Sequence, residues 1–312
     1  MERLSTLSDI PEAARGASVA IGNFDGVHLG HQSVIDLARR EDMALGILTF
    51  EPHPRHYFAD LAGKRLPAFR LMGPDAKANR MEKLGVDHVY EVPFDAALAA
   101  LTPEAFVEDV IVKGVGARHV VVGADFCFGK ARAGTAEMLK TLAGAHGVEV
   151  TIAPMVEAAS VRVSSTNIRT ALAEGRPRDA AAMLGHWHRL VGPVLHGDAR
   201  GRTLGYPTAN MALGALHQPA FGVYAVLVDV LDGPHAGSYH GAASIGVRPM
   251  FGENAANCET HIFDFKGDLY GAMISVGLVE HLRGERKFEN VEALVAQMGR
   301  DCDRARAILE AL

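Results

Sequence analysis

The chain has 312 residues and a formal net charge of −6, with 48% of its residues hydrophobic and 22% charged. At roughly 150 residues per domain, this length predicts two domains that can each bury a core. The apolar content excludes a largely disordered chain, and the sequence has no glycine period that would indicate a fibrous one. Lys+Arg and Asp+Glu number 20 and 23 in residues 1–180, and 11 and 14 in residues 181–312. Neither half therefore has the basic excess typical of nucleic-acid binding.

The cysteines indicate a reducing compartment. Cys127, Cys258 and Cys302 are far apart and odd in number, which fits neither a disulfide framework nor zinc-site spacing. No apolar run approaches the ~18 residues of a membrane span. The first ten residues carry acidic side chains where a signal peptide has an apolar stretch. We therefore expect a cytoplasmic protein without nucleic-acid or membrane partners.

The first half alternates short β-branched runs with helical stretches. Buried strands are expected over residues 18–24, 44–50, 88–92, 119–123 and 149–152. Helices are expected over residues 30–40, 103–113 and 135–145. Thr102 and Pro103 supply the N-cap and first-turn proline of the second helix. Repeated strand and helix units predict an α/β domain with a Rossmann-like parallel sheet, whose ligands bind at the carboxyl ends of the strands.

The sequence pattern changes around residues 180–190. From Arg189 onward the apolar runs are short and alternating, which predicts a small closed antiparallel β-barrel. Its strands are expected over residues 223–230, 239–245, 260–265 and 273–279. An amphipathic helix over 291–312 is expected to pack on that barrel. We place the boundary after a short helix at 179–184, which gives domains 1–184 and 185–312.

The segment from Ala20 to His31 runs from a strand into a helix and predicts a phosphate site. A helix N-terminus offers unpaired backbone N–H groups, and Gly26 and Gly30 let phosphate oxygens approach the backbone closely. His28 and His31 can then donate to an α-phosphate, which suits nucleotidyl transfer by charge stabilisation without a covalent nucleophile. Taken alone, two histidines at this spacing are also compatible with surface residues or an incidental metal pair.

A second phosphate clamp is expected before another helix. Ser164, Ser165 and Thr166 supply hydroxyls and amides, and Arg162 and Arg169 add positive charge suited to a leaving pyrophosphate. Without its context, Ser-Ser-Thr before a helix is also compatible with a simple N-cap.

The glycine-rich segment 196–210 carries a candidate magnesium site. Thr208 and Asn210 follow Pro207, and hydroxyl and amide oxygens suit Mg²⁺ together with substrate phosphates. The alternative is that Pro-Thr-Ala-Asn only forms a turn. Further on, Glu259 stands in a predicted strand, where a carboxylate could accept a hydroxyl proton. By itself, a glutamate at this place is more often a solvated strand residue.

Five strings of residues resemble one family in their order and spacing: 22–31, 48–55, 121–129, 162–169 and 196–210. The first string is similar to the signature of the nucleotidylyltransferase superfamily. Together with Glu259 and the segment 282–288, they resemble the bacterial bifunctional riboflavin kinase/FAD synthetases over nearly the whole chain. The resemblance implies a riboflavin kinase-like barrel that phosphorylates riboflavin to FMN with ATP. It also implies an N-terminal FMN adenylyltransferase domain that converts FMN to FAD and releases pyrophosphate.

The resemblance also implies roles for individual residues. Those expected to be catalytic are His28, His31, Arg169 and Glu259. Those expected to bind ATP or phosphate are Gly22, Asn23, Phe24, Asp25, Gly30, Arg162, Ser164, Ser165, Thr166, Gly201, Gly205 and Pro207. Those expected to contact flavin are Asp125, Phe126, Arg283 and Lys287. Thr208 and Asn210 would hold Mg²⁺ with ATP, and no tightly bound redox cofactor is expected.

Three positions depart from the family pattern. Ser244 stands where Asn is common, Met250 where Thr is usual and Cys127 where Arg is frequent. The first two leave an alternative open, in which the protein is a flavin- or nucleotide-binding regulator with a turnover-deficient kinase half. The retained Glu259 and Thr208 favour an enzyme. The Pro-Thr-Ala-Asn string disfavours a transferase for another acceptor. The partners expected are ATP, riboflavin, FMN and FAD, for a monomer or weak homo-oligomer.

Overall fold

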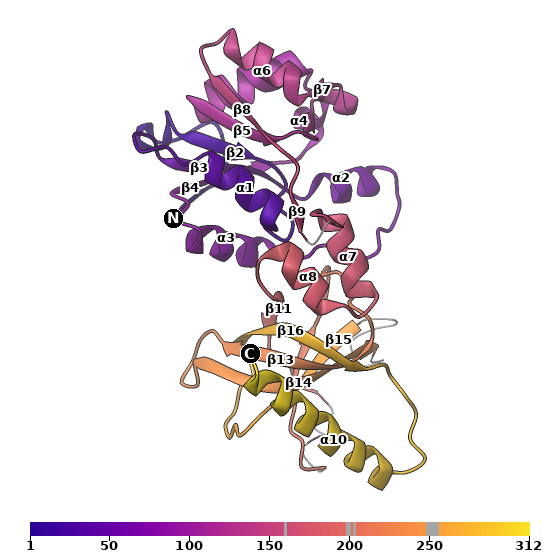
Figure 1. The fold of residues 1–312 in the computed structure, drawn as a ribbon. Helices are drawn as coiled ribbons and strands as arrows, with labels where there is room; N and C mark the ends of the chain where they lie inside the picture. Colours follow the sequence, from indigo (N-terminus) through magenta and orange to yellow (C-terminus); the bar gives the residue numbers. More distant parts are fainter. Residues whose placement is uncertain (159–160, 198–200, 202–203, 248–255) are drawn as a thin grey trace. The chain divides into compact units, whose positions relative to one another are not determined.

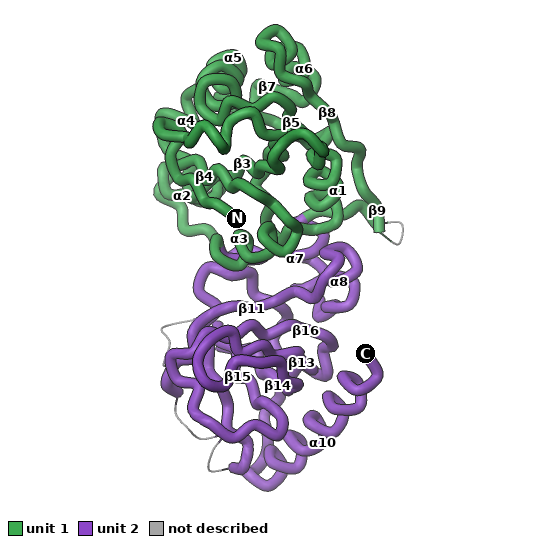
Figure 2. The backbone as a smooth tube through the Cα atoms, turned by 90° about the vertical axis from the view of Figure 1, so that its left-hand side faces the viewer, with its two compact units in different colours: residues 1–66, 74–164 green, residues 67–73, 165–312 purple. Residues whose placement is uncertain are grey.

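The structure is a computed structural model, and it describes residues 1–158, 161–197, 201, 204–247 and 256–312 (Figure 1). The chain divides into two compact units, which Figure 2 colours separately. Unit 1 consists of residues 1–66 and 74–164, and unit 2 of residues 67–73 and 165–312. No helix in the described ranges is long and apolar enough to cross a membrane.

Unit 1 is built on a six-stranded parallel sheet with the order β1-β4-β3-β2-β5-β8. The sequence predicts a parallel sheet and five of these strands, but neither β1 nor the strand order. Its strands are β1 (Glu2–Leu4), β2 (Ser18–Ile21), β3 (Leu45–Glu51), β4 (His88–Pro93), β5 (His119–Gly123) and β8 (Glu149–Ala153). The chain passes from β2 to β3 on one side, and β5 pairs with β2 on the other. Such a reversal of strand order is where ligands bind in open α/β sheets.

Helices follow most strands of unit 1 (Figure 1). They are α1 (Leu29–Leu37), α2 (Pro54–Leu61), α3 (Pro74–Lys83), α4 (Ala96–Ala100), α5 (Pro103–Ala105) and α6 (Ala136–Gly144). The helix expected over 103–113 begins at Pro103, with Thr102 as its N-cap. After Ala105 it continues as a π-helix, Phe106–Val115. Two short hairpins complete the unit: β6 (Cys127–Phe128) with β7 (Gly134–Thr135), and β9 (Glu157–Ala158) with β10 (Val161–Arg162).

Unit 2 contains a six-stranded antiparallel sheet with the order β11-β16-β13-β14-β15-β12. Its strands are β11 (His188–Pro193), β12 (Ala209–Ala212), β13 (Gly222–Val230), β14 (Gly237–Val247), β15 (Ala256–Ile262) and β16 (Met273–Arg283). A bridge between Leu195 and Asn210 brings the two edges together, so the sheet nearly closes as a barrel. The terminal helix α10 (Val291–Glu310) contacts β13, β14 and β16.

One predicted strand is displaced. The apolar pattern placed a strand over 260–265, whereas β15 spans Ala256–Ile262. Pairing with β14 begins at Ala256, opposite Val247, and Asp264 has a φ of 57°, which turns the chain. The strand therefore ends before Phe263 and Phe265, whose side chains pack as apolar residues beyond it.

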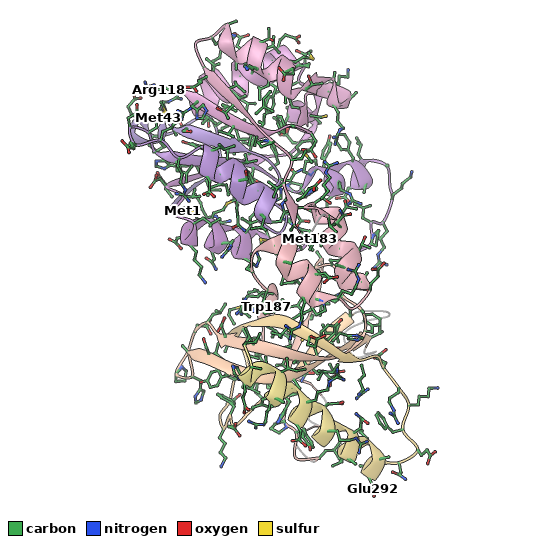
Figure 3. The ribbon with its side chains drawn as sticks, viewed as in Figure 1. Met1, Met43, Arg118, Met183, Trp187 and Glu292 are labelled. Atoms are coloured by element: carbon green, nitrogen blue, oxygen red, sulfur yellow. The ribbon has the colours of Figure 1, made fainter. Side chains whose placement is uncertain are left out.

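Two helices before the barrel belong to unit 2. They are α7 (Ser165–Ala173) and α8 (Pro177–Leu184), and α8 contacts β11 and β16. Met183 on α8 is 5% exposed, and Trp187 just before β11 packs against a small apolar cluster (Figure 3). Compactness therefore divides the chain before α7, whereas the predicted boundary lies after α8. We retain that boundary as a proposal about which residues serve which activity.

Candidate functional site

The loop between β2 and α1 brings two predicted histidines together. His28 is the N-cap of α1, and its Nδ1 accepts a hydrogen bond from the backbone N–H of His31 at 3.2 Å. The two imidazoles stack with their ring centroids 3.6 Å apart and their planes 13° from parallel. Phe24 and Val27 adopt the left-handed region, with φ of 51° and 42°, so the loop is tightly curled.

The imidazole of His31 favours the neutral form. Burial lowers the pKa of His31 well below its usual range, and the neighbouring charges of His28 and Lys77 lower it further. The Nδ1 of His31 is buried without a hydrogen-bond partner among the described residues. Because the Nδ1 of His28 accepts, its neutral ring carries the proton on Nε2. The pair can therefore present N–H donors to a phosphate at the start of a helix.

Gly30 leaves room for the imidazole of His28. A Cβ at this position would lie 3.2 Å from the imidazole Nδ1 of His28, which is closer than the ring tolerates without moving. Phe24 is buried at 1% exposure, and its ring contacts that of His31 at 5.1 Å. Asp25 is also buried, whereas Asn23 is exposed. The backbone N–H of Gly22 donates to Leu48, which continues the pairing of β2 with β3.

Two predicted residues with different expected ligands contact each other. Arg162 was expected to contact the pyrophosphate, and Asp125 was expected to contact the flavin. In the structure, Nη2 of Arg162 lies 2.7 Å from Oδ2 of Asp125, so the two form an ion pair. Both side chains are more than half exposed. Phe126 is half-buried and stacks on Phe128 at 5.6 Å. Ser164, the last residue of unit 1, directly precedes α7.

The remaining members of the second phosphate clamp lie on α7, in unit 2. Ser165 and Thr166 occupy its first two positions. The side chain of Arg169 donates to the carbonyl of Phe69 at 3.4 Å, and its guanidinium lies over the Phe69 ring at 5.8 Å. The carbonyl of Arg169 accepts from Nε2 of His217 at 2.9 Å. Arg169 is thus held by contacts from two other segments of its own unit.

The barrel places three polar side chains on one face. Glu259 on β15 is directly opposite Asn210 on β12 and Ser244 on β14. Directly paired residues of antiparallel strands point to the same side. Nδ2 of Asn257, one pleat away, donates to Oε1 of Glu259 at 3.3 Å. Thr208 immediately precedes β12, and its carbonyl accepts from Nδ2 of Asn210 at 3.4 Å.

The loop before β12 contains the three expected phosphate-binding positions. A Cβ on Gly201 would lie 2.3 Å from the carbonyl oxygen of Tyr206, and Gly205 has a φ of 84°. The turn therefore requires glycine at both places. The carbonyl of Pro207 accepts from Nδ1 of His261 at 2.9 Å. Residues 198–200 and 202–203 lie outside the described residues, as does Met250.

The predicted flavin contacts at the end of β16 differ in their surroundings. Arg283 forms an ion pair with Asp301 of α10 at 2.8 Å and lies over the ring of Phe288 at 5.6 Å. Asp301 is 7% exposed, so this pair fastens α10 to the barrel. Lys287, by contrast, is exposed.

The sequence reasoning did not identify Lys77, Thr49 or Asn257 as functional candidates. Thr49 lies within the string 48–55 that supports the resemblance, but its contacts depend on α3, which was not predicted. Asn257 had no signal beyond being two residues from Glu259. No cluster of three or more His, Cys, Asp or Glu side chains able to hold a metal occurs among the residues that the structure describes.

Unit 1 has a parallel sheet with a stacked histidine pair at a helix N-terminus, and unit 2 has a nearly closed antiparallel barrel with Asn210 and Glu259 on one face. Together these features are typical of a two-part phosphorus-group transferase. Comparisons with known proteins agree. The family model for FAD synthetase matches residues 10–167, and that for riboflavin kinase matches residues 184–309.

Curated relatives match nearly end to end. The bifunctional riboflavin kinase/FMN adenylyltransferase of Pseudomonas fluorescens is 38% identical, covering 99% of this chain and 98% of the relative. The protein of the same name from Escherichia coli K12 is 37% identical, with 96% and 94% covered. A crystal structure described as a macrolide-efflux protein from Streptococcus pneumoniae is 33% identical, with a TM-score of 0.82 over 97% of this chain and 98% of that one.

The chain belongs to the bifunctional riboflavin kinase/FMN adenylyltransferase family. Its two activities form FMN from riboflavin and FAD from FMN, and they use ATP.

Proposed function

We propose that the histidine loop of unit 1 carries FMN adenylylation. We further propose that riboflavin phosphorylation is carried by Asn210 and Glu259 on one face of the barrel, together with Thr208 just before β12. The observation that supports the first assignment best is the stacked pair of His28 and His31 at the N-terminus of α1. The second is supported by the direct pairing of Asn210 with Glu259.

In adenylylation, a phosphate oxygen of FMN attacks the α-phosphorus of ATP in line, and the bond to pyrophosphate breaks. His28 and His31 would donate hydrogen bonds to the α-phosphate oxygens, where negative charge develops. Neutral imidazoles suit this role because two stacked cations would repel each other. Ser165, Thr166 and Arg169 would stabilise the leaving pyrophosphate through hydroxyl, amide and guanidinium donors.

In phosphorylation, the carboxylate of Glu259 would accept the proton of the terminal ribityl hydroxyl as that oxygen attacks the γ-phosphorus of ATP. The bond between the γ-phosphorus and the bridging oxygen breaks, and ADP leaves. The amide of Asn257 donates to one oxygen of this carboxylate, which restrains its orientation on the strand.

The donor set of Thr208 and Asn210 fits Mg²⁺. Nδ2 of Asn210 donates to the Thr208 carbonyl, which leaves the amide oxygen as the ligand atom. A Cβ on Gly197 would lie 2.5 Å from Nδ2 of Asn210, so glycine keeps the space beside this amide open. When bound, Mg²⁺ neutralises charge on the ATP phosphates.

The test incubates the pure protein with riboflavin, ATP and Mg²⁺, separates the flavins by chromatography over time, and runs a parallel reaction from FMN. We expect FMN first and then FAD from riboflavin, and FAD directly from FMN. FAD from FMN alone would contradict a working barrel site. Absence of any product would favour a binding regulator.

We further propose a cytoplasmic monomer or weak homo-oligomer. The compartment is supported by the cysteines, since Cys127, Cys258 and Cys302 are all free. Light scattering at micromolar concentration tests this, and a single stable oligomer would contradict it.

A further inference from the structure

A lysine is buried behind the histidine loop. Lys77 extends from α3 and is 2% exposed. Its ammonium group forms an ion pair with Oε1 of Glu51 at 2.8 Å and donates to Oγ1 of Thr49 at 3.0 Å. Burying a charge is costly unless it is paired and hydrogen-bonded, so this arrangement is strongly specified. Both partners lie on β3, at the end of the strand where ligands bind in a parallel sheet.

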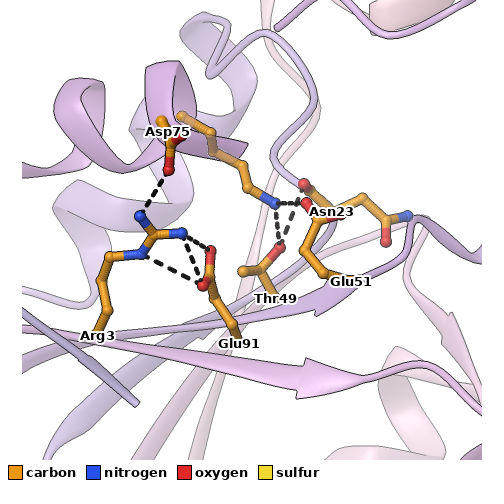
Figure 4. Close-up of polar contacts among 7 residues, drawn as sticks. Arg3, Asn23, Thr49, Glu51, Asp75 and Glu91 are labelled. Carbon is orange, nitrogen blue, oxygen red and sulfur yellow. Dashed lines mark hydrogen bonds and ion pairs between the residues drawn. The ribbon is translucent and has the colours of Figure 1, made fainter. Parts of the chain in front are cut away.

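The donors and acceptors between Lys77, Thr49 and Asn23 can be assigned without ambiguity. An ammonium group can only donate, so Thr49 must accept from Lys77. The single hydroxyl proton of Thr49 is then left to donate, and its oxygen lies 3.3 Å from the backbone carbonyl of Asn23 (Figure 4). Lys77 therefore fixes which way the Thr49 hydroxyl points, and the hydroxyl holds the first part of the histidine loop. Thr49 is fully buried, so water does not compete for these bonds.

We propose that Lys77 is a positioning residue for adenylyl transfer, which through Thr49 fixes Asn23 and so holds His28 and His31 where the α-phosphate reacts. This inference rests on the proposed role of the two histidines. The tight curl at Phe24 gives the reason for such support, because a loop with left-handed residues needs external contacts to keep one conformation. The charge of Lys77 also contributes to the lowered pKa of His31, which indicates that the two groups lie close.

A second ion-pair cluster also joins α3 to the sheet, and it provides a control. Arg3 of β1 forms ion pairs with Asp75 of α3 at 2.8 Å and with Glu91 of β4 at 3.0 Å (Figure 4). This cluster also joins α3 to the sheet, but the Arg3 side chain is 39% exposed. Within the described part of the chain, the side chain of Arg3 contacts Asp75 and Glu91 and not the histidine loop. Loss of Arg3 therefore weakens the attachment of α3 without disturbing Thr49 or Asn23.

The experiment measures kcat and KM for FAD formation from FMN, riboflavin kinase turnover, and Tm for four full-length variants. Thr49→Val removes only the hydroxyl and keeps the pair of Lys77 with Glu51. We expect kcat for adenylylation to fall about tenfold, because small displacements of reacting groups cost this much or more. KM for FMN and kinase turnover should stay within about twofold of the wild-type values, since neither depends on the loop.

The other variants separate positioning from folding. Thr49→Ser restores the hydroxyl and should recover most of kcat. Lys77→Met should lower kcat further, provided that it folds, and Arg3→Met should lower Tm while leaving kcat unchanged. Wild-type kcat in Thr49→Val, or an equal loss of kcat in Arg3→Met, would overturn the inference. His28→Asn measured in parallel identifies the source of a failure. If His28→Asn retains adenylylation, the proposed function of the histidine loop is wrong. If His28→Asn loses adenylylation and Thr49→Val retains it, the proposed role of Lys77 is wrong.

Discussion

The two proposed sites keep their side chains in place by different means. In unit 1, His28 and His31 stand at the end of a loop that contains left-handed residues and is held from behind by Thr49. In unit 2, Asn210 and Glu259 face each other because the register of two paired strands sets their positions. On a sheet face, the hydrogen bonds between strands fix the relative positions of the side chains. A site on a loop needs additional buried polar contacts to hold its side chains in place.

This contrast predicts where distant substitutions act. Adenylylation should respond to changes behind the loop that touch no substrate, while the kinase should respond mainly to residues on the polar face itself. Because both activities occur on one chain, each serves as the folding control for the other.

Replacement of His28 should have the largest effect. We expect His28→Asn to lower FAD formation from FMN by about 10²- to 10³-fold, the typical loss when one donor to developing charge is removed. Asparagine is a good N-cap, so α1 keeps its start and the loss reports the imidazole. FMN formation from riboflavin should be unchanged. A parallel loss of kinase turnover would contradict the assignment of the two activities to separate sites.

Replacement of Glu259 should have the converse effect. Glu259→Gln keeps the shape of the side chain but removes the base, so kinase turnover should fall by about 10²-fold or more. Adenylylation of supplied FMN should continue at the wild-type rate. Unchanged kinase turnover would show that another group accepts the ribityl proton.

Loss of the Asn257 amide should have a smaller effect on the same activity. A hydrogen bond to a carboxylate is worth about 1.5–3 kcal/mol, so Asn257→Ala should reduce kinase turnover by roughly tenfold or more. Thr260→Val is the matched control. Its hydroxyl contacts Cys258 on the opposite, core-facing side of the same strand. If both variants lose turnover equally, β15 as a whole is responsible and the amide has no separate role.

The last expected effect is on the stability of unit 2 and its dependence on pH, and not on turnover. Burial, with the charges of His217 and His186, lowers the pKa of His188 from 6.5 to about 3. Below about pH 6.5 the imidazole of His188 is therefore protonated in the unfolded chain but not in the folded one. The free energy of unfolding then falls by up to ~1.4 kcal/mol for each pH unit, down to about pH 3. His188→Leu should flatten this decline in urea unfolding between pH 6.5 and 4. An unchanged slope would contradict a buried neutral His188.

Local patterns predict the strands of unit 1 well because each is a continuous buried run. The expected strand 119–123 matches β5 to the residue. They do less well in the barrel, where β15 is displaced because pairing with β14 and the turn at Asp264 decide its limits. The edge strand β1 and the helix α3 were not predicted. The first is three residues long, and the second is held by ion pairs from distant strands.

The candidate site divides in the same way. His28 and His31 are predictable because their spacing and the helix start are local features of one segment. Lys77 is not predictable, because a lysine on a polar helix ordinarily faces solvent and only the assembled sheet buries it. Asn257 is similar, since its contact with Glu259 depends on the conformation of neighbouring side chains on a single strand.

The position of α7 bears on how the chain can be divided in the laboratory. Ile168 and Leu172 of α7 are almost fully buried, the Leu172 carbonyl accepts from the backbone of Ala220, and α8 packs on β11 and β16. A gene fragment that stops at codon 184 would produce these helices without the strands that cover them. It would expose apolar surface and release Arg169 from His217. Separate expression of the adenylyltransferase half should therefore yield a poorly soluble, weakened enzyme, whereas the two halves on one chain supply the missing surface.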